Sequence, residues 1–503
     1  MKRIITLVFV CLGSVLLAQP DFVKDSLDKY IEREMKKWQI PAVAVAIVKD
    51  GKVIVSKGYG TTEKGGGKKV DENTLFQIAS NSKAFTGTAL AMLDQQKKIS
   101  LDDKANKWLP YFSLQDPYAS GETTVRDLLC HRIGFQTFQS DFLNWNCNMS
   151  RKEIIESMKN VKPVYSFRAK YGYCNSAFLA AGEIIKAATD TTWDDYLKQH
   201  FFTPLYMLRT STTWQAIKKD KNAAVPYTLV KNKLTKLEYA NVDNLGPAAS
   251  INSCVKDMSH WLMCQLDSGK YLGHYIIPYS ALQATRTPQI VAGRGGNPNY
   301  PGNHFSLYGL GWGIKDVAGK VMYEHTGGAD GFVTSVCVIP ESQLGVVVLT
   351  NTDQNDFFLS LREQILQAYF NQPYVNLSAE SFKDFDEYNK KSIADLIDLE
   401  NKTKQKGLVF SLPKEMPGKY YNEVYGEIEV KKAGSGFAIT FAHHPQAKGE
   451  LTYMGDDTYL CEYSYITWGT QKLKVNIEEG KIKSLTVRVN NFVDYMGYDF
   501  VKK

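Results

Sequence analysis

The most informative stretch of this sequence is Phe76-Gln-Ile-Ala-Ser-Asn-Ser-Lys-Ala-Phe-Thr86, where an apolar, strand-like run becomes a helical pattern. Ser80 and Lys83 stand three residues apart there, and on a helix such residues share a face. A desolvated lysine with a lowered pKa can take the proton of a serine hydroxyl and make it a nucleophile. The stretch therefore predicts a Ser-x-x-Lys nucleophile in the first turn of a helix, where the Ser80 N–H and the helix dipole can face an oxyanion.

The same four-residue pattern occurs a second time, as Ser253-Cys-Val-Lys256. One copy of so short a motif is weak evidence by itself, so the choice between the two depends on other parts of the chain. We interpret the copy at Ser253 as a decoy.

Length and composition indicate a globular protein with more than one core. The chain has 503 residues, of which 44% are hydrophobic and 22% charged. Such a length exceeds one ordinary domain, and the two fractions are those of soluble globular proteins. The formal net charge of +7 is spread thinly over this length, which predicts a mildly basic surface and no nucleic-acid partner.

Residues 1–18 have the pattern of a secretory signal peptide. Met1-Lys2-Arg3 is basic, residues 4–17 are apolar, and Ala18 is a small residue suited to cleavage. The apolar run is shorter than the about 20 residues that a permanent span needs. We therefore expect export to the periplasm or the extracellular space, without a stable membrane span.

The seven cysteines beyond the leader are scattered and lack any C-x-x-C spacing. This predicts neither a disulfide framework nor a zinc site, and most of them are expected to be buried small hydrophobes. In an exported protein one pair, such as Cys130 with Cys147, could still be oxidised. The sequence implies no metal and no cofactor.

Residues 19–373 have strand patterns at both ends and a helical region between them. A helical opening precedes a hairpin over 41–55, in which Asp50-Gly51 supplies the turn. The region from Ser80 to about Thr287 is helical and irregular. Later strands are predicted at 308–314, 321–325, 332–339 and 345–350, before an amphipathic helix at 358–370. We predict an α+β domain with one antiparallel sheet built from both ends, flanking helices and a helical insertion.

The pattern changes twice after residue 373. Residues 374–413 are polar and helix-prone, which predicts a linker helix. Residues 414–503 consist of short alternating runs separated by turn residues, which predicts a small all-β barrel or sandwich.

Tyr173-Cys-Asn175 could supply two groups that a Ser/Lys pair needs. A phenol near two cationic groups can be ionised, or it can relay a proton to a leaving group. The Asn175 amide can bind both Lys83 and a substrate carbonyl. A core tyrosine and a turn asparagine are the plainer interpretation of the same residues.

A third element, His325-Thr-Gly-Gly328, ends an apolar strand. Glycines at this place let a substrate backbone approach the strand closely. The Gly328 N–H could face an oxyanion from the side opposite the Ser80 N–H.

Together the three motifs resemble those of the class C serine β-lactamases and the related penicillin-binding-protein-like peptidases and esterases. That family has Ser-x-x-Lys, Tyr-x-Asn and Lys-Thr-Gly or His-x-Gly in this order, and the resemblance covers roughly residues 25–370. It implies the β-lactamase/penicillin-binding-protein fold and catalysis by Ser80, Lys83 and Tyr173. It also implies an oxyanion hole of the Ser80 and Gly328 N–H groups and substrate contacts by Asn175, His325, Thr326 and Gly327.

The resemblance also assigns other parts of the chain. Ser253 falls where the family starts a structural helix, so we expect it to cap that helix. His325 replaces the lysine of β-lactamases, and a histidine is mostly neutral near pH 7. This weakens the case for an efficient β-lactamase and favours the esterase and D-amino-acid-peptidase branches. The tail resembles a lipocalin-like domain, which could cap the site, bind a ligand or mediate assembly.

Five other side chains are assigned no chemistry. His131 is expected to be a structural histidine. Trp145 and Trp312 could line a pocket, but buried aromatics are the plainer interpretation. His443-His444 lies beside a proline-containing turn and is expected to be a solvated loop rather than a metal site.

The sequence thus predicts an exported serine hydrolase that forms an acyl-enzyme on Ser80. A peptidase or amidase for D-amino-acid or cell-wall-type peptides is the first hypothesis, with a small-molecule or peptide substrate that could derive from peptidoglycan. The alternatives are a carboxylesterase for small acyl esters, and a β-lactamase or a β-lactam sensor that stalls after acylation. Whether the protein forms an oligomer stays open.

Overall fold

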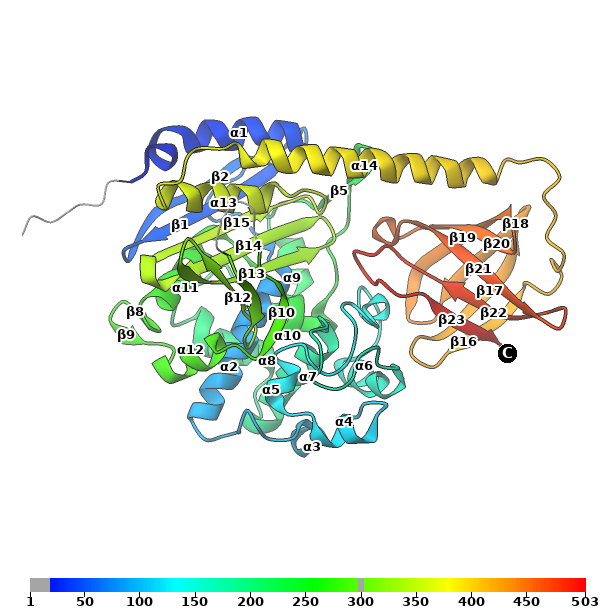
Figure 1. Ribbon diagram of the computed structural model, residues 1–503, viewed down its shortest axis with the longest axis horizontal. Coiled ribbons are helices and arrows are strands. Elements are labelled where there is room, and N and C mark those ends of the chain that lie inside the picture. The colour runs from blue at the N-terminus through cyan, green and yellow to red at the C-terminus, as the bar shows by residue number, and fades with distance from the viewer. Residues whose placement is uncertain (1–18, 297–302) are drawn as a thin grey trace, which may run out of the picture.

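The computed structural model describes residues 19–296 and 303–503 (Figure 1). The predicted signal peptide, residues 1–18, lies outside the described residues. Within those two ranges, no helix combines the length and the apolar character that crossing a bilayer would require.

A nine-stranded antiparallel sheet forms the centre of the larger part of the molecule, in the order β10-β11-β12-β13-β14-β15-β1-β2-β3. The N-terminal hairpin pairs with β15, so strands from both ends of the predicted domain share one sheet, as the sequence indicated. Asp50 and Gly51 both have positive φ, as a tight hairpin turn of this kind requires. The strands are β1 (Ala42–Lys49), β2 (Lys52–Glu63), β3 (Gly66–Lys69), β10 (Ile290–Arg294), β11 (Phe305–Tyr308), β12 (Gly313–Val317), β13 (Lys320–Ala329), β14 (Phe332–Ile339) and β15 (Leu344–Thr350).

The single strand predicted over residues 308–314 is wrong, because the chain turns there between β11 and β12. The turn packs directly on the helix that follows Ser80. A Cβ on Gly311 would lie 2.3 Å from the Lys83 carbonyl oxygen, and one on Gly87 would lie 2.1 Å from that of Leu310. Apolar turn residues buried against a helix look like a strand in the sequence.

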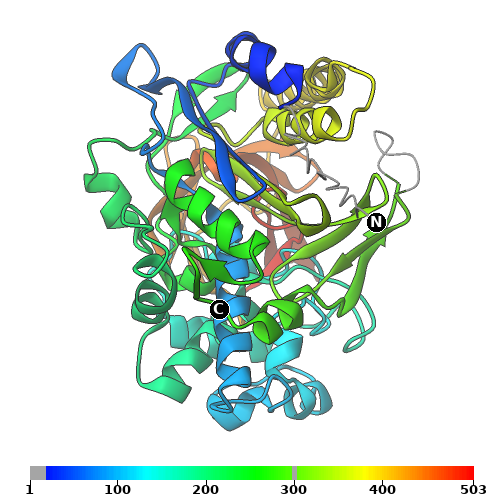
Figure 2. The ribbon, with the colours of Figure 1, turned by 90° about the vertical axis from the view of Figure 1, so that its left-hand side faces the viewer.

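Helices cover both faces of the sheet (Figures 1 and 2). On one face lie α1 (Leu27–Trp38) and α13 (Phe357–Tyr369), and on the other α11 (Val255–Leu266) packs against β1 and β15. The predicted helical insertion surrounds α2 (Ser82–Gln95). Its other helices are α3 (Ala105–Trp108), α4 (Pro117–Glu122), α5 (Val125–Leu128), α6 (Arg151–Ser157), α7 (Asn175–Thr189), α8 (Trp193–Leu197), α9 (Trp214–Lys219), α10 (Gly246–Ala249) and α12 (Tyr279–Arg286).

Three two-stranded ribbons complete this part of the molecule. They are β4 (Phe76–Gln77) with β7 (Asn252–Ser253), β5 (Tyr227–Val230) with β6 (Lys233–Lys236), and β8 (Lys270–Tyr271) with β9 (His274–Tyr275). The first of them joins the residues before Ser80 to those before α11.

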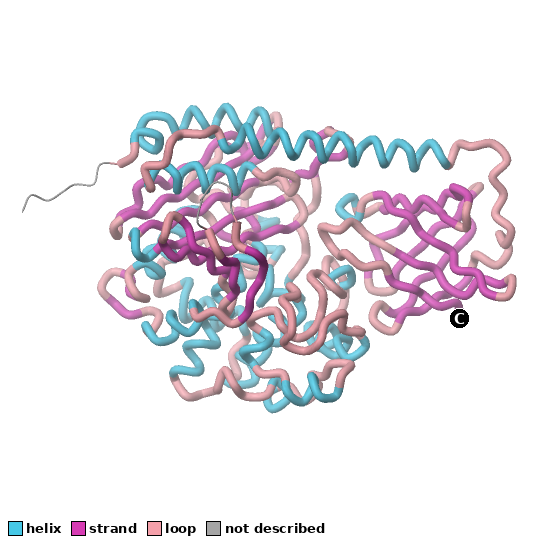
Figure 3. The backbone as a smooth tube through the Cα atoms, in the orientation of Figure 1, coloured by secondary structure: helices cyan, strands magenta, loops and turns pink. Residues whose placement is uncertain are grey.

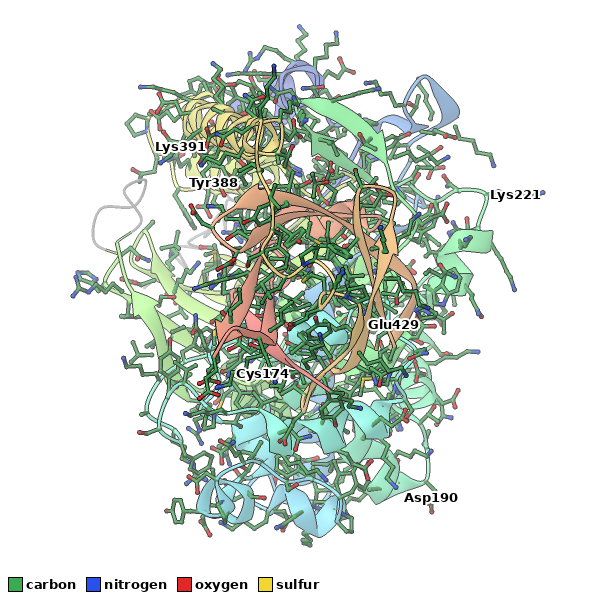
Figure 4. All side chains as sticks on the ribbon, turned by 90° about the vertical axis from the view of Figure 1, so that its right-hand side faces the viewer. Cys174, Asp190, Lys221, Tyr388, Lys391 and Glu429 are labelled. Carbon is green, nitrogen blue, oxygen red and sulfur yellow. The ribbon has the colours of Figure 1, made fainter. Side chains whose placement is uncertain are left out.

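A long helix, α14 (Leu377–Lys402), runs from the sheet part toward the barrel (Figure 1). Its first turns are anchored on α1, where the Trp38 indole donates a hydrogen bond to Ser378 at 2.8 Å and packs edge-on against Phe382. Further along, the helix is largely exposed, and Tyr388 is 74% exposed. Tyr388 and Lys391 lie at the periphery of the molecule when it is viewed from the barrel side (Figure 4).

Eight strands close into a barrel at the C-terminal end (Figure 3). Its interior is filled by apolar and aromatic side chains such as Tyr420, Ile439, Tyr459 and Leu485, as small closed barrels require. Of the two predicted architectures, the barrel is therefore confirmed. The strands are β16 (Gly418–Asn422), β17 (Gly426–Ala433), β18 (Gly436–Phe441), β19 (His444–Gly455), β20 (Thr458–Tyr463), β21 (Thr470–Glu478), β22 (Lys481–Val487) and β23 (Tyr498–Lys502).

The barrel docks on the loop that follows Gly134. Phe142 from this loop is buried against Trp468 and Tyr425 of the barrel, with ring centroids 4.9 and 5.1 Å apart. His444 is buried at the same contact, where its Nε2 lies 2.9 Å from the Trp145 carbonyl oxygen. The prediction of a solvated loop is therefore wrong for His444, because its cover comes from a distant part of the chain.

All seven cysteines within the described ranges are free. Cys130 is buried and its thiol faces the Asp127 carbonyl oxygen, whereas the Cys147 sulfur accepts a hydrogen bond from Asn244. The two therefore do not form the disulfide that the sequence left open.

Candidate active site

Ser80 lies in a short 3-10 turn, Ala79–Asn81, directly before α2. The prediction placed it in the first turn of the helix itself. Ala79 has a φ of +47°, in the left-handed region that is unfavourable for a residue with a Cβ. The Asn81 amide holds the turn by donating to Thr334 Oγ1 at 2.8 Å, so a tight turn presents Ser80 ahead of the helix.

The Lys83 amine lies within hydrogen-bonding distance of the Ser80 hydroxyl. Lys83 Nζ lies 3.1 Å from Ser80 Oγ, 2.6 Å from Asn175 Oδ1 and 2.9 Å from the Ala248 carbonyl oxygen. Burial lowers the pKa of Lys83 to about 7, and the charge of Asp141 opposes this shift. A neutral Lys83 can donate to the two acceptor oxygens and still offer its lone pair to the Ser80 proton. The pair can therefore act as nucleophile and base near neutral pH.

Tyr173 lies beside the same two groups. Its hydroxyl hydrogen-bonds Ser80, its ring lies 4.5 Å from Lys83 Nζ, and its other neighbour, His131, stacks on it at 4.2 Å. Burial raises the pKa of Tyr173 well above its usual value. Of the two roles that the sequence left open for Tyr173, this shift of its pKa favours the neutral phenol over the ionised one. A proton relay is the role that this geometry allows.

His131 has the structural role that the sequence suggested. Its Nδ1 accepts a hydrogen bond from the Cys174 N–H at 3.0 Å, and burial lowers its pKa well below the usual value. The neutral ring thus fixes the backbone between Tyr173 and Asn175.

Asn175, the first residue of α7, connects Lys83 to a carboxyl group that the sequence did not reveal. Its Oδ1 accepts from Lys83 and its Nδ2 donates to Asp141 Oδ2 at 2.6 Å. Burial, and next the charge of Asp494 in the barrel, raise the pKa of Asp141 to about 7. Asp141 lies on the barrel-docking loop, and no motif marks it.

His325, in β13, is held by both ring nitrogens. Its Nδ1 lies 2.6 Å from the Thr326 carbonyl oxygen and its Nε2 lies 2.9 Å from the Tyr308 hydroxyl. A carbonyl can only accept, so Nδ1 carries the proton and Nε2 accepts from Tyr308. Burial, with the nearby Lys83 charge, lowers the pKa of His325 to about 4. The neutral ring lines the pocket with both nitrogens already bonded.

The two glycines of the third motif have different neighbours. A Cβ on Gly327 would lie 2.0 Å from the Ile78 carbonyl oxygen. The space that a side chain would need at Gly327 is thus filled by the chain's own nucleophile turn, which requires glycine at this position. Gly328, by contrast, borders the pocket together with Thr326.

The edge of β13 beyond Glu324 is open toward the pocket. Its pairing with β12 ends at the pair Gly313 and Glu324, whereas its pairing with β14 continues to Ala329. Residues 325–328 therefore have a partner strand on one side only, and a substrate backbone can occupy the other.

The cavity in front of Ser80 has a volume of about 360 Å³. Residues from five parts of the chain line it: the turn before α2, the docking loop with Trp145, the segment 171–175, the edge of the sheet and the barrel segment 488–497. The barrel residues are Phe492, Val493 and Tyr495. Trp145 is buried and also borders this cavity, so both roles that the sequence allowed for it hold, whereas Trp312 is fully buried.

The second Ser-x-x-Lys copy does not form a pair. Ser253 Oγ lies 2.8 Å from Thr210 Oγ1, while Lys256 makes an exposed ion pair with Glu72 at 3.0 Å. The residue before α11 is Cys254, and Ser253 does not cap the helix, because its hydroxyl is bonded to Thr210 instead. Across residues 19–296 and 303–503 no three His, Cys, Asp or Glu side chains are grouped so as to hold a metal ion.

This geometry is that of the Ser-x-x-Lys serine hydrolases, the class that includes β-lactamases and penicillin-binding proteins. Residues 27–370 match the family model described as Beta-lactamase. The chain belongs to the β-lactamase family.

Two known sequences illustrate the relationship. The chain is 28% identical to Protein flp of Staphylococcus aureus (strain N315) over 332 residues, which are 65% of this chain and 63% of that protein. It is 25% identical to unguisins hydrolase ungD of Aspergillus violaceofuscus over 362 residues, 67% of this chain and 64% of that protein. The match therefore spans less than two thirds of the length of these relatives.

Solved structures show the same fold. An octameric penicillin-binding protein homologue from Pyrococcus abyssi has a TM-score of 0.61 at 19% identity and covers 95% of this chain and 99% of its own. A D-stereospecific amidohydrolase from Streptomyces sp. has a TM-score of 0.55 at 20% identity and covers 68% of this chain and 97% of its own. The first likeness extends over nearly the whole chain, including the barrel.

Proposed function

We propose that this protein is an exported serine hydrolase that works through an acyl-enzyme on Ser80, as a peptidase or amidase for D-amino-acid or cell-wall-type peptides. The observation that carries the proposal is the Lys83 amine, buried, 3.1 Å from Ser80 Oγ and with its pKa lowered to about 7. A base with a pKa near the working pH is the best suited to general base catalysis.

The proposed reaction has two halves. Neutral Lys83 takes the Ser80 proton while Oγ bonds to the substrate carbonyl carbon and the carbonyl electron pair moves to oxygen. The Ser80 and Gly328 N–H groups would bind that oxyanion. The bond to the leaving nitrogen or oxygen then breaks, and the proton passes from Lys83 through the Tyr173 hydroxyl to the leaving group. Water repeats the sequence on the acyl-enzyme and frees Ser80.

Two related hydrolases and the neutral state of His325 support the substrate hypothesis. One structural neighbour is a D-stereospecific amidohydrolase and one relative a hydrolase of unguisins, which favours amide or peptide substrates. A neutral His325 offers no permanent positive charge for a substrate carboxylate, which argues against an efficient β-lactamase. The apolar lining of the cavity keeps a carboxylesterase as the second candidate.

Intact mass spectrometry after exposure to a fluorophosphonate tests the nucleophile. We expect one adduct on the wild type and on Ser253→Ala, and none on Ser80→Ala. An adduct retained by Ser80→Ala would refute the assignment. Lys256→Ala, a surface change, is the matched control for Lys83→Ala, which we expect to lower kcat/KM by about 10²- to 10⁴-fold.

The substrate class is tested separately. A D-alanyl anilide and a p-nitrophenyl ester, compared on wild type and Ser80→Ala, rank amidase against esterase, and ester turnover with negligible amide turnover would select the esterase. With penicillin, an adduct that lasts for hours would favour a sensor, and rapid turnover would favour a β-lactamase.

Export and assembly are parts of the proposal with their own tests. N-terminal sequencing of protein recovered from the periplasm or medium should begin after Ala18. The Pyrococcus neighbour is octameric, so light scattering on the purified protein should be compared with the mass of one chain, 56.7 kDa before processing.

A further inference from the structure

The barrel contributes directly to the wall of the catalytic cavity. Phe492, Val493 and Tyr495, all from the segment 488–497 between β22 and β23, border the cavity that contains Ser80. This segment is more than 400 residues from Ser80 in the sequence, and it belongs to a part of the chain outside the family match.

The barrel segment is held in a defined shape. Asn490 starts it, since its side-chain oxygen accepts from the Phe492 N–H at 3.0 Å and its carbonyl from the Val493 N–H at 2.8 Å. Asp494 is buried and accepts from the hydroxyls of Tyr425 at 3.1 Å and Tyr498 at 2.9 Å. These bonds fix the segment before any substrate arrives.

Aromatic rings face the cavity on this side. The ring of Phe492 lies so close to Gly328 that a Cβ there would be 3.2 Å from it. Tyr495 lies 5.4 Å from Phe138, which in turn meets the ring of Tyr173 at 5.5 Å, edge to face. Phe492 and Tyr495 are 38% and 43% exposed. Exposed aromatic side chains that cluster beside the proposed nucleophile indicate a ligand-binding surface.

Two charged residues that line the cavity, Lys315 and Glu324, are paired with each other. Glu324 lies between Lys315 and Arg362, at 2.8 Å from each. A charged substrate group would have to break this ion pair to bind to either member of it, whereas an apolar group would bury the exposed faces of the rings.

We propose that Phe492 and Tyr495 of the barrel, with Phe138, form a subsite that binds an apolar, preferably aromatic, group attached to the scissile carbonyl. The assignment to the acyl side rests on the proposed function, because Gly328, which Phe492 touches, is the proposed oxyanion donor. The barrel then helps to select the substrate through its 488–497 segment. It does not do so through its interior, which is filled by side chains.

Two esters that differ only in the acyl group test the subsite: p-nitrophenyl acetate and p-nitrophenyl phenylacetate. We expect Phe492→Ala to lower kcat/KM for the phenylacetate by about tenfold and for the acetate by less than about twofold. Tyr421→Ala, which removes an exposed aromatic elsewhere on the barrel, is the matched control and should change neither. An equal loss for both esters, or no loss for either, would overturn the subsite.

A binding experiment separates this proposal from the proposed function. Ser80→Ala protein should bind phenylacetamide at least about tenfold more tightly than acetamide in an NMR titration, and Phe492→Ala in that background should remove the difference. Failure of the fluorophosphonate labelling with this binding intact would reject the nucleophile and keep the subsite. Labelling of Ser80 with equal binding of the two amides would reject the subsite alone.

Discussion

Asp141 and Phe142 are consecutive residues of one loop, and their side chains contact different parts of the molecule. Asp141 Oδ2 accepts a hydrogen bond from Asn175, which binds the Lys83 amine, whereas the ring of Phe142 is buried against Trp468 in the barrel. The backbone N–H of Phe142 also lies 3.4 Å from Asp494 of the barrel. The barrel thus fixes the position of a carboxyl group that faces the active site.

The activity of the wild type should fall with decreasing pH around neutrality. Lys83 must be neutral to accept the Ser80 proton, and burial lowers the pKa of Lys83 to about 7. As pH falls through this value the amine becomes an ammonium, so kcat/KM should drop about tenfold per unit on the acid side. A pH–rate profile with a p-nitrophenyl ester measures it. Activity that stays flat from pH 8 to pH 5 would show that Lys83 is not the base.

Asp141→Asn should move the acid limb of this pH–rate profile to lower pH. The Asp141 charge raises the pKa of Lys83, and asparagine keeps an oxygen for the Asn175 amide while removing the charge. The other groups near Lys83 are Cys174, whose pKa burial raises to about 12, and the neutral His131 and His325. None of these supplies a compensating negative charge near pH 7.

The control for Asp141→Asn is Asp353→Asn. Asp353 is also a carboxyl group whose pKa burial raises to about 7, but it bonds the Gly331 N–H rather than Asn175. Its replacement should leave the acid limb of the pH–rate profile at the same pH as in the wild type. An unchanged limb in Asp141→Asn as well would mean that Asp141 acts only through packing.

Gly327→Ala should destabilise the protein and impair catalysis together. The added Cβ would lie 2.0 Å from the Ile78 carbonyl oxygen, so either β13 or the nucleophile turn must shift. Forcing extra volume into a packed site costs about 1–3 kcal/mol of unfolding free energy. Thermal melting and kcat/KM measure the two effects. Gly66→Ala, where a Cβ meets nothing within 4 Å, is the control, and equal behaviour of the two variants would contradict this account.

Short-range patterns predicted the parts of the site that depend on spacing alone. Ser80 and Lys83 are three positions apart and Tyr173 and Asn175 two, so each pair depends on local structure alone, and the structure brings all four together. The sheet could be predicted because strand patterns and the Asp50-Gly51 turn are local as well.

Other features depend on contacts between distant segments and could not be predicted. Asp141 gains its role from Asn175 and Asp494, and His444 is buried only because Trp145 lies over it. Phe492 reaches Gly328 across 164 positions of sequence, and no periodicity reports such a contact. These features all lie where the barrel meets the catalytic part.

Phe142→Ala should weaken the contact between the barrel and the docking loop. It should also lower activity by more than its lower stability alone would explain. The ring fills a fully buried site among barrel aromatics, and losing such a ring costs about 3–5 kcal/mol. Phe437→Ala removes a ring of the same size from the barrel core, where it packs 5.9 Å from Tyr459 and away from the docking loop. Both variants should melt earlier. Only Phe142→Ala should also lower kcat/KM at temperatures where both are folded, and quicken proteolysis in the 403–417 connection, because only it releases the loop that carries Asp141. Equal activity of the two folded variants would show that the barrel can detach without disturbing the catalytic groups.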